Sequence, residues 1–289
     1  LDEVARRFGA HLIEMRRHVH QYPELSGEEM ETSAFVQAEL QRLGIPFQTG
    51  FARTGVLGIL EGALPGKTVA LRADMDALPI LEKNKGPVVS TRPGIMHACG
   101  HDAHTTMLLG AAALLKERQA QLPGRVLFIF QPAEEASPHG GAGPMMEDGL
   151  FAQYVPDVIY GQHVWPDLEV GQIGVRDGAM MANSDTFTIT IQGAGGHASM
   201  PHQGVDAILV AAQIIVSAQS VVSRNVDPLK SVVLSICTIE TDSQARNVIP
   251  HTVKMTGTVR CLDEKMRDVA EESLRRIVTS TAEAFGATA

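Results

Sequence analysis

Residues 67–76 read KTVALRADMD, a run that is apolar almost throughout and then ends in two aspartates. Two later segments follow the same plan, since RVLFIF (125–130) leads into QPAEE and DVIYG (157–161) leads into Gln-His. Such runs are typical of strands buried on both faces, in a parallel or mixed sheet covered by helices. Helices are predicted over roughly 1–20, 28–43 and 105–117. The first part of the chain is therefore predicted to be an α/β domain with a mixed, mainly parallel sheet.

The strand pattern changes near residue 180. In TFTITIQ (186–192) and VKMTGTVRC (253–261), apolar and polar residues alternate, which is typical of an antiparallel sheet with one covered face. A third strand is predicted at 231–240, with helices at about 205–222 and, after the capping residue Asp263, up to about 285. The order β-α-β-β-α is a split βαβ plan, ferredoxin-like, that needs one more strand. We therefore expect two domains, 1–178 and 179–289, and further protein after the last residue.

The overall composition narrows the range of partners. The 289 residues include 33 acidic and 24 basic side chains, a formal net charge of -9, and 4% aromatic residues. A negative field repels nucleic acid and anionic lipid, and scarce aromatic residues argue against base-stacking surfaces, so no nucleic-acid partner is expected. No uninterrupted apolar run approaches the ~18 residues of a membrane span, so no membrane partner is expected. The three cysteines are too few for a disulfide scaffold and favour a reducing, cytoplasmic location.

Polar side chains with catalytic or metal-binding chemistry follow each buried run, and another group lies in the segment MHACGHDAH (96–104). Ligands of open α/β sheets bind at the carboxyl ends of the strands. We therefore expect these side chains to gather at one edge of the sheet. They are Asp74, Asp76, Cys99, His101, Glu134, Glu135 and His163.

The combination of these residue types predicts a metal site, although each has an ordinary structural explanation when taken alone. Cys99 and His101 are spaced for a loop whose side chains both reach one ion. Of two adjacent carboxylates such as Glu134 and Glu135, one can bind metal while the other reaches the bound water. Thiolate and imidazole ligands favour Zn, Co or Ni, and carboxylates also accept Mn. Two such ions sharing a water would form a clamp used in hydrolysis.

A cysteine nucleophile is a competing interpretation of the same residues. Cys99 would need a neighbouring base, and His101 or His163 could serve. The surplus of carboxylates argues against this chemistry, because a thiolate nucleophile needs no adjacent pair of glutamates.

Several segments, in order from about residue 15 to residue 260, resemble one family. They are MRRHVHQYPELSGEE (15–29), LRADMDALPI (71–80), MHACGHDAHTTMLLGAA (96–112), FQPAEE (130–135), GQHVWP (161–166), GAGGHAS (193–199) and RNVIP (246–250). They resemble metallopeptidase family twenty, in the branch of N-acyl-amino-acid amidohydrolases, hippurate hydrolases and auxin-conjugate hydrolases. The succession HACGHD, PAEE and GQH is specific to that branch.

The resemblance implies a hydrolase that cleaves the amide of an N-acyl amino acid, giving a carboxylic acid and a free amino acid. It implies two divalent metal ions per subunit, Zn, Mn, Co or Ni. Glu134 would be the general base, and Asp76 would orient the metal ligands from behind. The ligands themselves would be Cys99, His101, Glu135 and His163.

The second domain resembles the lid and dimerisation domain of the family, which implies a homodimer or a higher oligomer. His197 would reach an active site, that of the partner subunit, and stabilise the developing oxyanion. Asn247, with Arg246, would bind the carboxylate or carbonyl oxygen of the substrate. On the residues alone, the favoured interpretation is a turn with a surface histidine for GGH and the start of a strand for NVIP.

Two departures from the family pattern are visible in the sequence. In the family, the catalytic domain resumes after the lid and supplies one more histidine ligand, and this chain ends before that segment. The stretch ASPHGGAGPMM (136–146) carries Pro138 and His139, where members of the family usually have a simpler, glycine-rich sequence. This difference affects the expected shape of the pocket.

Two alternative functions remain open at this point. The chain could be a dipeptidase or carboxypeptidase of the same family, with a peptide as the substrate. It could also be an inactive metal-binding protein. The pair Glu134-Glu135 favours an enzyme, because a purely structural metal site needs no spare carboxylate beside it.

Overall fold

The computed structural model describes residues 2–136 and 139–289, and it forms two compact units that divide between Glu169 and Val170. Residues 170–184, which begin the second unit, contain no helix or strand. The predicted domain boundary after residue 178 falls inside this segment. Pro138, singled out in the sequence, lies outside the described residues.

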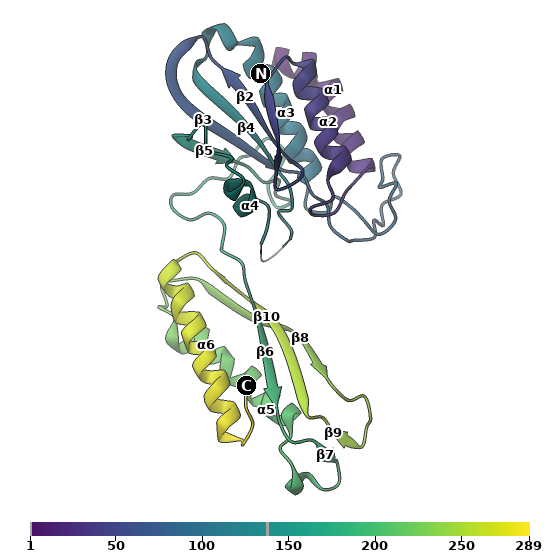
Figure 1. Cartoon of the computed structure of the whole chain (residues 1–289), viewed down its shortest axis with the longest axis vertical. Helices are drawn as coiled ribbons and strands as arrows, with labels where there is room; N and C mark the ends of the chain where they lie inside the picture. Colours follow the sequence, from purple (N-terminus) through teal and green to yellow (C-terminus); the bar gives the residue numbers. More distant parts are fainter. Residues whose placement is uncertain (1, 137–138) are drawn as a thin grey trace. The chain divides into compact units, whose positions relative to one another are not determined.

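The first unit is built on one mixed five-stranded sheet (Figure 1). Strand β3 pairs in parallel with β4 and β5, whereas β1 with β2 and β2 with β4 are antiparallel. The strands, in sheet order, are β1 (Phe47–Phe51), β2 (Gly55–Glu61), β4 (Pro123–Gln131), β3 (Leu64–Asp74) and β5 (Val158–Gly161). The prediction of a mixed sheet in an α/β unit is confirmed.

Helices cover both faces of this sheet, which explains the uninterrupted apolar runs. In β4, Phe128 and Phe130 belong to the cluster under α1, α2 and α3, while Leu127 and Ile129 pack with Met145 of α4 on the other face. The helices are α1 (Asp2–Gln21), α2 (Met30–Arg42), α3 (His101–Glu117) and α4 (Ala142–Glu147), with a short 3-10 turn, η1 (Gln119–Gln121). Burying both faces requires a strand that is apolar along its whole length.

Strands β1 and β2 were not among the predicted strands. The turn between them places Ala52 and Arg53 at φ 43° and 73°, in the left-handed region that non-glycine residues seldom adopt. Gly58 interrupts the apolar run of β2, which begins at another glycine, Gly55, so only short apolar stretches remain.

The second unit has the predicted alternating strands. Its antiparallel sheet has the order β6 (Asp185–Gln192), β10 (Thr252–Cys261) and β8 (Val232–Thr241). Helix α5 (Ala207–Ser220), the π-helical turn η3 (Val221–Asn225) and helix α6 (Glu264–Ala284) bury their apolar residues with one face of this sheet. The carboxylate of Asp263 accepts a hydrogen bond from the Met266 amide and caps α6. The smaller elements are β7 (Gly196–His197), η2 (Pro201–Gln203) and β9 (Val248–Ile249).

After α6 the chain returns to the outer edge of β6. Thr288 and Gln192 exchange two backbone hydrogen bonds, of 2.8 and 3.0 Å, in an antiparallel bridge. This is the edge at which a split βαβ plan places its fourth strand. That strand remains a prediction.

One helix meets a membrane-span criterion of length and mean hydropathy, although polar residues such as Gln213 and Gln219 interrupt its apolar run. Ala207–Asn225, which is α5 with η3, is long and apolar enough by length and composition. Val210, Ile214 and Val221 on this segment are fully buried in the core of the second unit. A core helix of a folded domain meets the same criteria, so the segment is weak evidence for a membrane span.

Candidate metal centre

Three strands and one helix bring the predicted site residues of the first unit together. The parallel strands β3, β4 and β5 end at one edge of the sheet, and Asp76, Glu134 and His163 follow them in the loops there. Helix α3 begins at His101, directly after Gly100, whose φ of 89° turns the chain into the helix. Carboxylates, imidazoles and a thiol therefore converge from four segments, as predicted.

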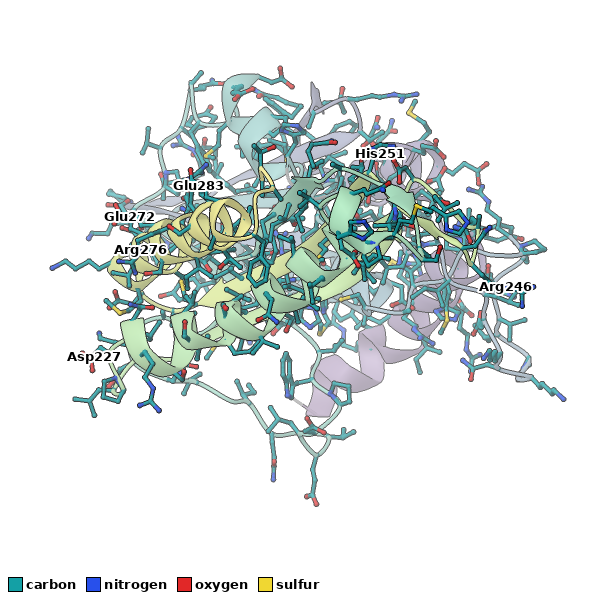
Figure 2. The ribbon with its side chains drawn as sticks, turned by 90° about the horizontal axis from the view of Figure 1, so that it is seen from below. Asp227, Arg246, His251, Glu272, Arg276 and Glu283 are labelled. Carbon is teal, nitrogen blue, oxygen red and sulfur yellow. The ribbon has the colours of Figure 1, made fainter. Side chains whose placement is uncertain are left out.

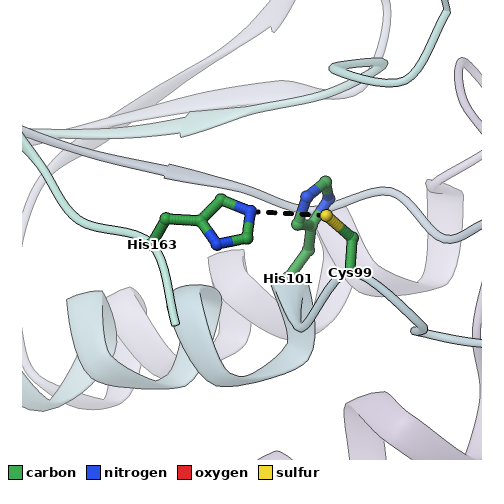
Figure 3. A group of neighbouring side chains, drawn as sticks. All are labelled: Cys99, His101 and His163. Carbon is green, nitrogen blue, oxygen red and sulfur yellow. Dashed lines mark hydrogen bonds between the residues drawn. The ribbon is translucent and has the colours of Figure 1, made fainter. Parts of the chain in front are cut away.

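Cys99, His101 and His163 form one group of possible ligands (Figure 3). Their ligand atoms lie within 4.8 Å of one another, and Cys99 Sγ is 3.3 Å from His163 Nε2. The carbonyl of Val164 can only accept a hydrogen bond, so the 2.7 Å contact requires His163 Nδ1 to be the donor. In the neutral ring this leaves the Nε2 lone pair facing Cys99, which is the form that binds metal.

His101 also belongs to a second group, with Glu134 and Glu135. Its Nε2 atom is buried, has no hydrogen-bond partner among the described residues, and lies 3.9 Å from a Glu135 carboxylate oxygen. An unpaired polar atom of this kind costs about 1–3 kcal/mol unless a ligand satisfies it. A third group joins His101 to Asp74 and His104. Together the three groups contain a thiol, imidazoles and carboxylates, the donor set that suits Zn, Co, Ni or Mn.

His97 is the other buried ring without hydrogen-bond partners among the described residues. Burial lowers the pKa of His97 to about 4, so the ring is neutral at pH 7. It belongs to none of the ligand groups found in the described structure. The unpaired His101 nitrogen therefore differs from the His97 ring in having other possible metal ligands around it.

Asp76 contacts His101 and the backbone of Glu135, which suits the orienting role that the resemblance implies. One carboxylate oxygen is 3.2 Å from His101 Nδ1, and the other accepts hydrogen bonds from Ser26 Oγ (2.6 Å) and the Glu135 amide (2.9 Å). Burial alone would raise the pKa of Asp76, but these hydrogen bonds outweigh it and lower the pKa. An ionised Asp76 holds Nδ1 of His101 protonated, so Nε2 is free to bind an ion.

Asp74 and His104 are two site residues to which the sequence assigned no role. His104 Nδ1 is 2.6 Å from Asp74 Oδ1, and His104 Nε2 accepts a hydrogen bond from the Val164 amide. Arg72 donates to the other Asp74 oxygen at 2.7 Å. Burial would raise the pKa of Asp74, but the His104 hydrogen bond and the Arg72 charge lower it well below its usual range. Both His104 nitrogens are satisfied, so this pair fixes the backbone beside His163.

The electrostatics of the site discriminate between the two chemistries considered for Cys99. Burial and the negative charges of Glu135, Glu134 and Asp74 raise the pKa of Cys99 to about 12. A thiol with this pKa is a poor nucleophile at neutral pH, whereas a bound cation would stabilise its thiolate. Burial and the Glu135 charge also raise the pKa of Glu134.

The remaining predicted residues lie together in the second unit. His197 of β7 pairs with Val248 of β9, and the Ala198 amide donates to the Asn247 carbonyl at 3.0 Å. His197 is exposed, and its Nδ1 atom is 2.8 Å from the hydroxyl of Ser199. Arg246, next to Asn247, is exposed toward one end of this unit, as Figure 2 shows.

Comparisons with known proteins agree with the motifs. The model of "Peptidase family M20/M25/M40" matches residues 70–288. An N-acetyl-L-cysteine deacetylase of Bacillus subtilis is 47% identical over 274 residues, which cover 95% of this chain and 65% of that protein. An N-acyl-L-amino acid amidohydrolase of Geobacillus stearothermophilus is 46% identical, with coverage of 96% and 74%. The chain thus spans about two thirds to three quarters of the length of these relatives.

The fold is shared with solved structures as well. A dinuclear metal-binding peptidase of the M20 family from Bacillus subtilis superimposes with a TM-score of 0.81 at 38% identity, covering 98% of this chain and 72% of that one. The matched residues include the segments that carry the ligand groups. The family resemblance drawn from the sequence is thereby confirmed, and the chain belongs to peptidase family M20/M25/M40.

Proposed function

We propose that the protein is a metal-dependent amidohydrolase that cleaves N-acyl amino acids into a carboxylic acid and a free amino acid. One observation carries the proposal: three groups of possible ligands meet at His101, whose buried Nε2 has no partner among the described residues, and one of them contains the carboxylates of Glu134 and Glu135. The names of the relatives, a deacetylase and an amidohydrolase that act on N-acyl amino acids, support this substrate class.

Two divalent ions per subunit, Zn, Mn, Co or Ni, fit the donor set. Cys99, His101, Glu135 and His163 would hold them, and the similarity to a dinuclear metal-binding peptidase of the same family supports this number. When bound, such ions lower the pKa of water and polarise an acyl carbonyl.

Glu134 then has the role of proton carrier. Its carboxylate takes the proton of the attacking water and returns it to the nitrogen of the leaving amino acid. The raised pKa of Glu134 favours this exchange, since it brings the acid closer to neutral pH. Asp76 holds His101 and the Glu135 backbone in place through both of its oxygens.

Residues 1–178 would form the catalytic domain and 179–289 a ferredoxin-like lid and dimerisation domain. His197 would reach the active site of the partner subunit and donate a hydrogen bond to the oxyanion that forms at the acyl carbon. Asn247, with Arg246, would bind the carboxylate or carbonyl oxygen of the substrate. The outer face of α5 exposes Ile208, Leu209 and Val216, which suits a homodimer contact. A cytoplasmic location suits Cys99, because a reducing compartment keeps the thiol available.

The test is metal analysis coupled to hydrolysis of N-acetyl and N-benzoyl amino acids, with and without a chelator. Two metals per chain and chelator-sensitive amide cleavage are expected. Metal without turnover on this panel, but with cleavage of dipeptides, would replace the proposal by a peptidase. A metal-free protein with full activity would refute the metal centre.

A further inference from the structure

The loop that carries Glu134 contains a residue in an uncommon backbone conformation. Ala133, directly before Glu134, has a φ of 52°. A residue with a Cβ atom adopts this left-handed region only where the surrounding structure holds it there. The loop must therefore be fixed by contacts that outweigh this preference.

Two buried carboxylates provide such contacts, one on each side of Glu134. The Ala133 amide donates to Glu29 Oε1 at 2.8 Å, and the Glu135 amide donates to Asp76 Oδ2 at 2.9 Å. Glu29 and Asp76 are 0% and 1% exposed. The backbone is thus anchored directly before and directly after the residue that carries protons in the proposed function.

Glu29 is itself held by one residue of its own segment and one of another. The Gly27 amide donates to its Oε1 atom at 2.9 Å, and the Thr54 hydroxyl donates to its Oε2 atom at 2.7 Å. Both oxygens are therefore satisfied, and the carboxylate has no freedom to turn away from Ala133. Fixed partners of this kind are what a positioning group requires.

A purely local role for Glu29, capping of its own helix, does not fit the contacts. Glu29 precedes α2 but makes no side-chain hydrogen bond to the first turn of that helix. The amides of Glu31 and Thr32 donate instead to Glu24, another buried carboxylate. The Glu29 side chain bridges to a loop that is distant in the sequence.

We propose that Glu29 is a positioning residue for Glu134, acting through the amide of Ala133. The inference rests on the proposed role of Glu134 in proton transfer. It also assigns a purpose to the acidic end of MRRHVHQYPELSGEE, the motif segment that the metal ligands and the proton carrier leave unused.

Three variants test this role. Glu29→Gln keeps Oε1 as an acceptor for both amides, and its Nε2 can donate to the Thr54 hydroxyl. Glu29→Leu removes the acceptor. Glu24→Leu is the matched control, because it removes a buried carboxylate at the start of the same helix without touching the loop at Ala133.

In the metal-loaded protein, Glu29→Leu is expected to lower kcat by about 10²-fold with little change in KM, the effect of a misplaced catalytic group. Metal content should be unchanged, and the Ala133 amide should lose its protection from hydrogen exchange, as measured by NMR. Glu29→Gln should retain most of the kcat and most of the protection of the Ala133 amide. Glu24→Leu should lower stability while leaving the Ala133 amide protected.

The outcomes separate this inference from the proposed function. If Glu134→Gln abolishes turnover but Glu29→Leu behaves like Glu24→Leu in kcat and exchange, the positioning role is wrong and the proton carrier stands. If Glu134→Gln retains normal turnover, the proposed function has failed instead. If Glu29→Leu does not fold, hydrogen exchange in the protein without substitutions still tests the inference. An Ala133 amide that exchanges there as fast as an exposed loop amide would overturn it.

Discussion

Replacing Asp74 by Asn should destabilise the first unit by an amount that can be worked from its contacts. The buried carboxylate of Asp74 pairs with His104 at 2.6 Å and accepts a hydrogen bond from Arg72 at 2.7 Å. Asparagine keeps one oxygen for one of these donors, but its amide NH2 faces the other, so one buried donor is left unpaired at a cost of about 1–3 kcal/mol. The remaining contact also loses the charge of the carboxylate, and the expected total is about 3 kcal/mol. This agrees with the usual cost of removing one partner from a buried pair. Arg72 retains its contact with Gln131, so we expect no larger loss.

Urea unfolding of the chelator-treated protein, followed by the fluorescence of Trp165, measures this loss. Trp165 is the one tryptophan of the sequence and follows Val164, whose amide donates to His104. The control is Asp157→Asn, an exposed aspartate of the same unit that accepts from the Thr68 amide; it should cost about 1 kcal/mol. Equal losses of unfolding free energy in the two variants would refute the reasoning.

The contribution of Asp74 to the free energy of unfolding should also depend on pH. Because the folded-state pKa of Asp74 is lowered, this contribution is present above pH ~4 and declines as the pH falls below that value.

Three further predictions concern the site and its surroundings. Glu134→Gln should keep both metals, measured by elemental analysis, while most turnover is lost; near-normal kcat would mean that another group carries the proton. Cys99→Ser should lower metal occupancy under the same analysis, and full occupancy would exclude Cys99 as a ligand. His20 is buried with its ring nitrogens 2.8 Å from Asp102 and 3.2 Å from Glu82, and the Asp102 hydrogen bond is the main cause of its raised pKa. The loss of unfolding free energy in His20→Gln should therefore be greatest below pH ~6.5 and decline as the pH rises through the folded-state pKa; a loss that does not vary with pH would contradict the assignment.

The strands that form the site edge were predictable because of their burial. β3 and β4 are apolar along most of their length since both faces are covered, and the polar residues that follow them mark where the strands end. β1 and β2 were not predicted because β1 is short and mostly exposed and Gly58 interrupts β2. The strands of the second unit were equally predictable from their alternation of apolar and polar residues, since helices bury only one face of that sheet.

The candidate site was predictable in its residue types, and less so in its supporting contacts. The helix predicted at residue 105 begins at His101 in the structure, so His101 and His104 lie one turn apart on the same helix. A sequence interpretation that put both in a loop could not pair His104 with Asp74. Glu29 was missed for another reason: its acceptor role depends on an amide distant in the sequence, for which no side-chain pattern exists. The spacing of the HACGHDAH motif was the one available signal for His104.

The protonated thiol of Cys99 has a consequence for how the site is filled. With a pKa of about 12, this side chain carries its proton throughout the range in which proteins are stable. A metal ion that takes Cys99 as a ligand must expel that proton into the solvent. Each step of one unit toward acid therefore weakens metal uptake by about tenfold through this residue alone. Lowering the pH would therefore favour release of the metal ions, and the protein would bind them most tightly on the alkaline side of neutrality.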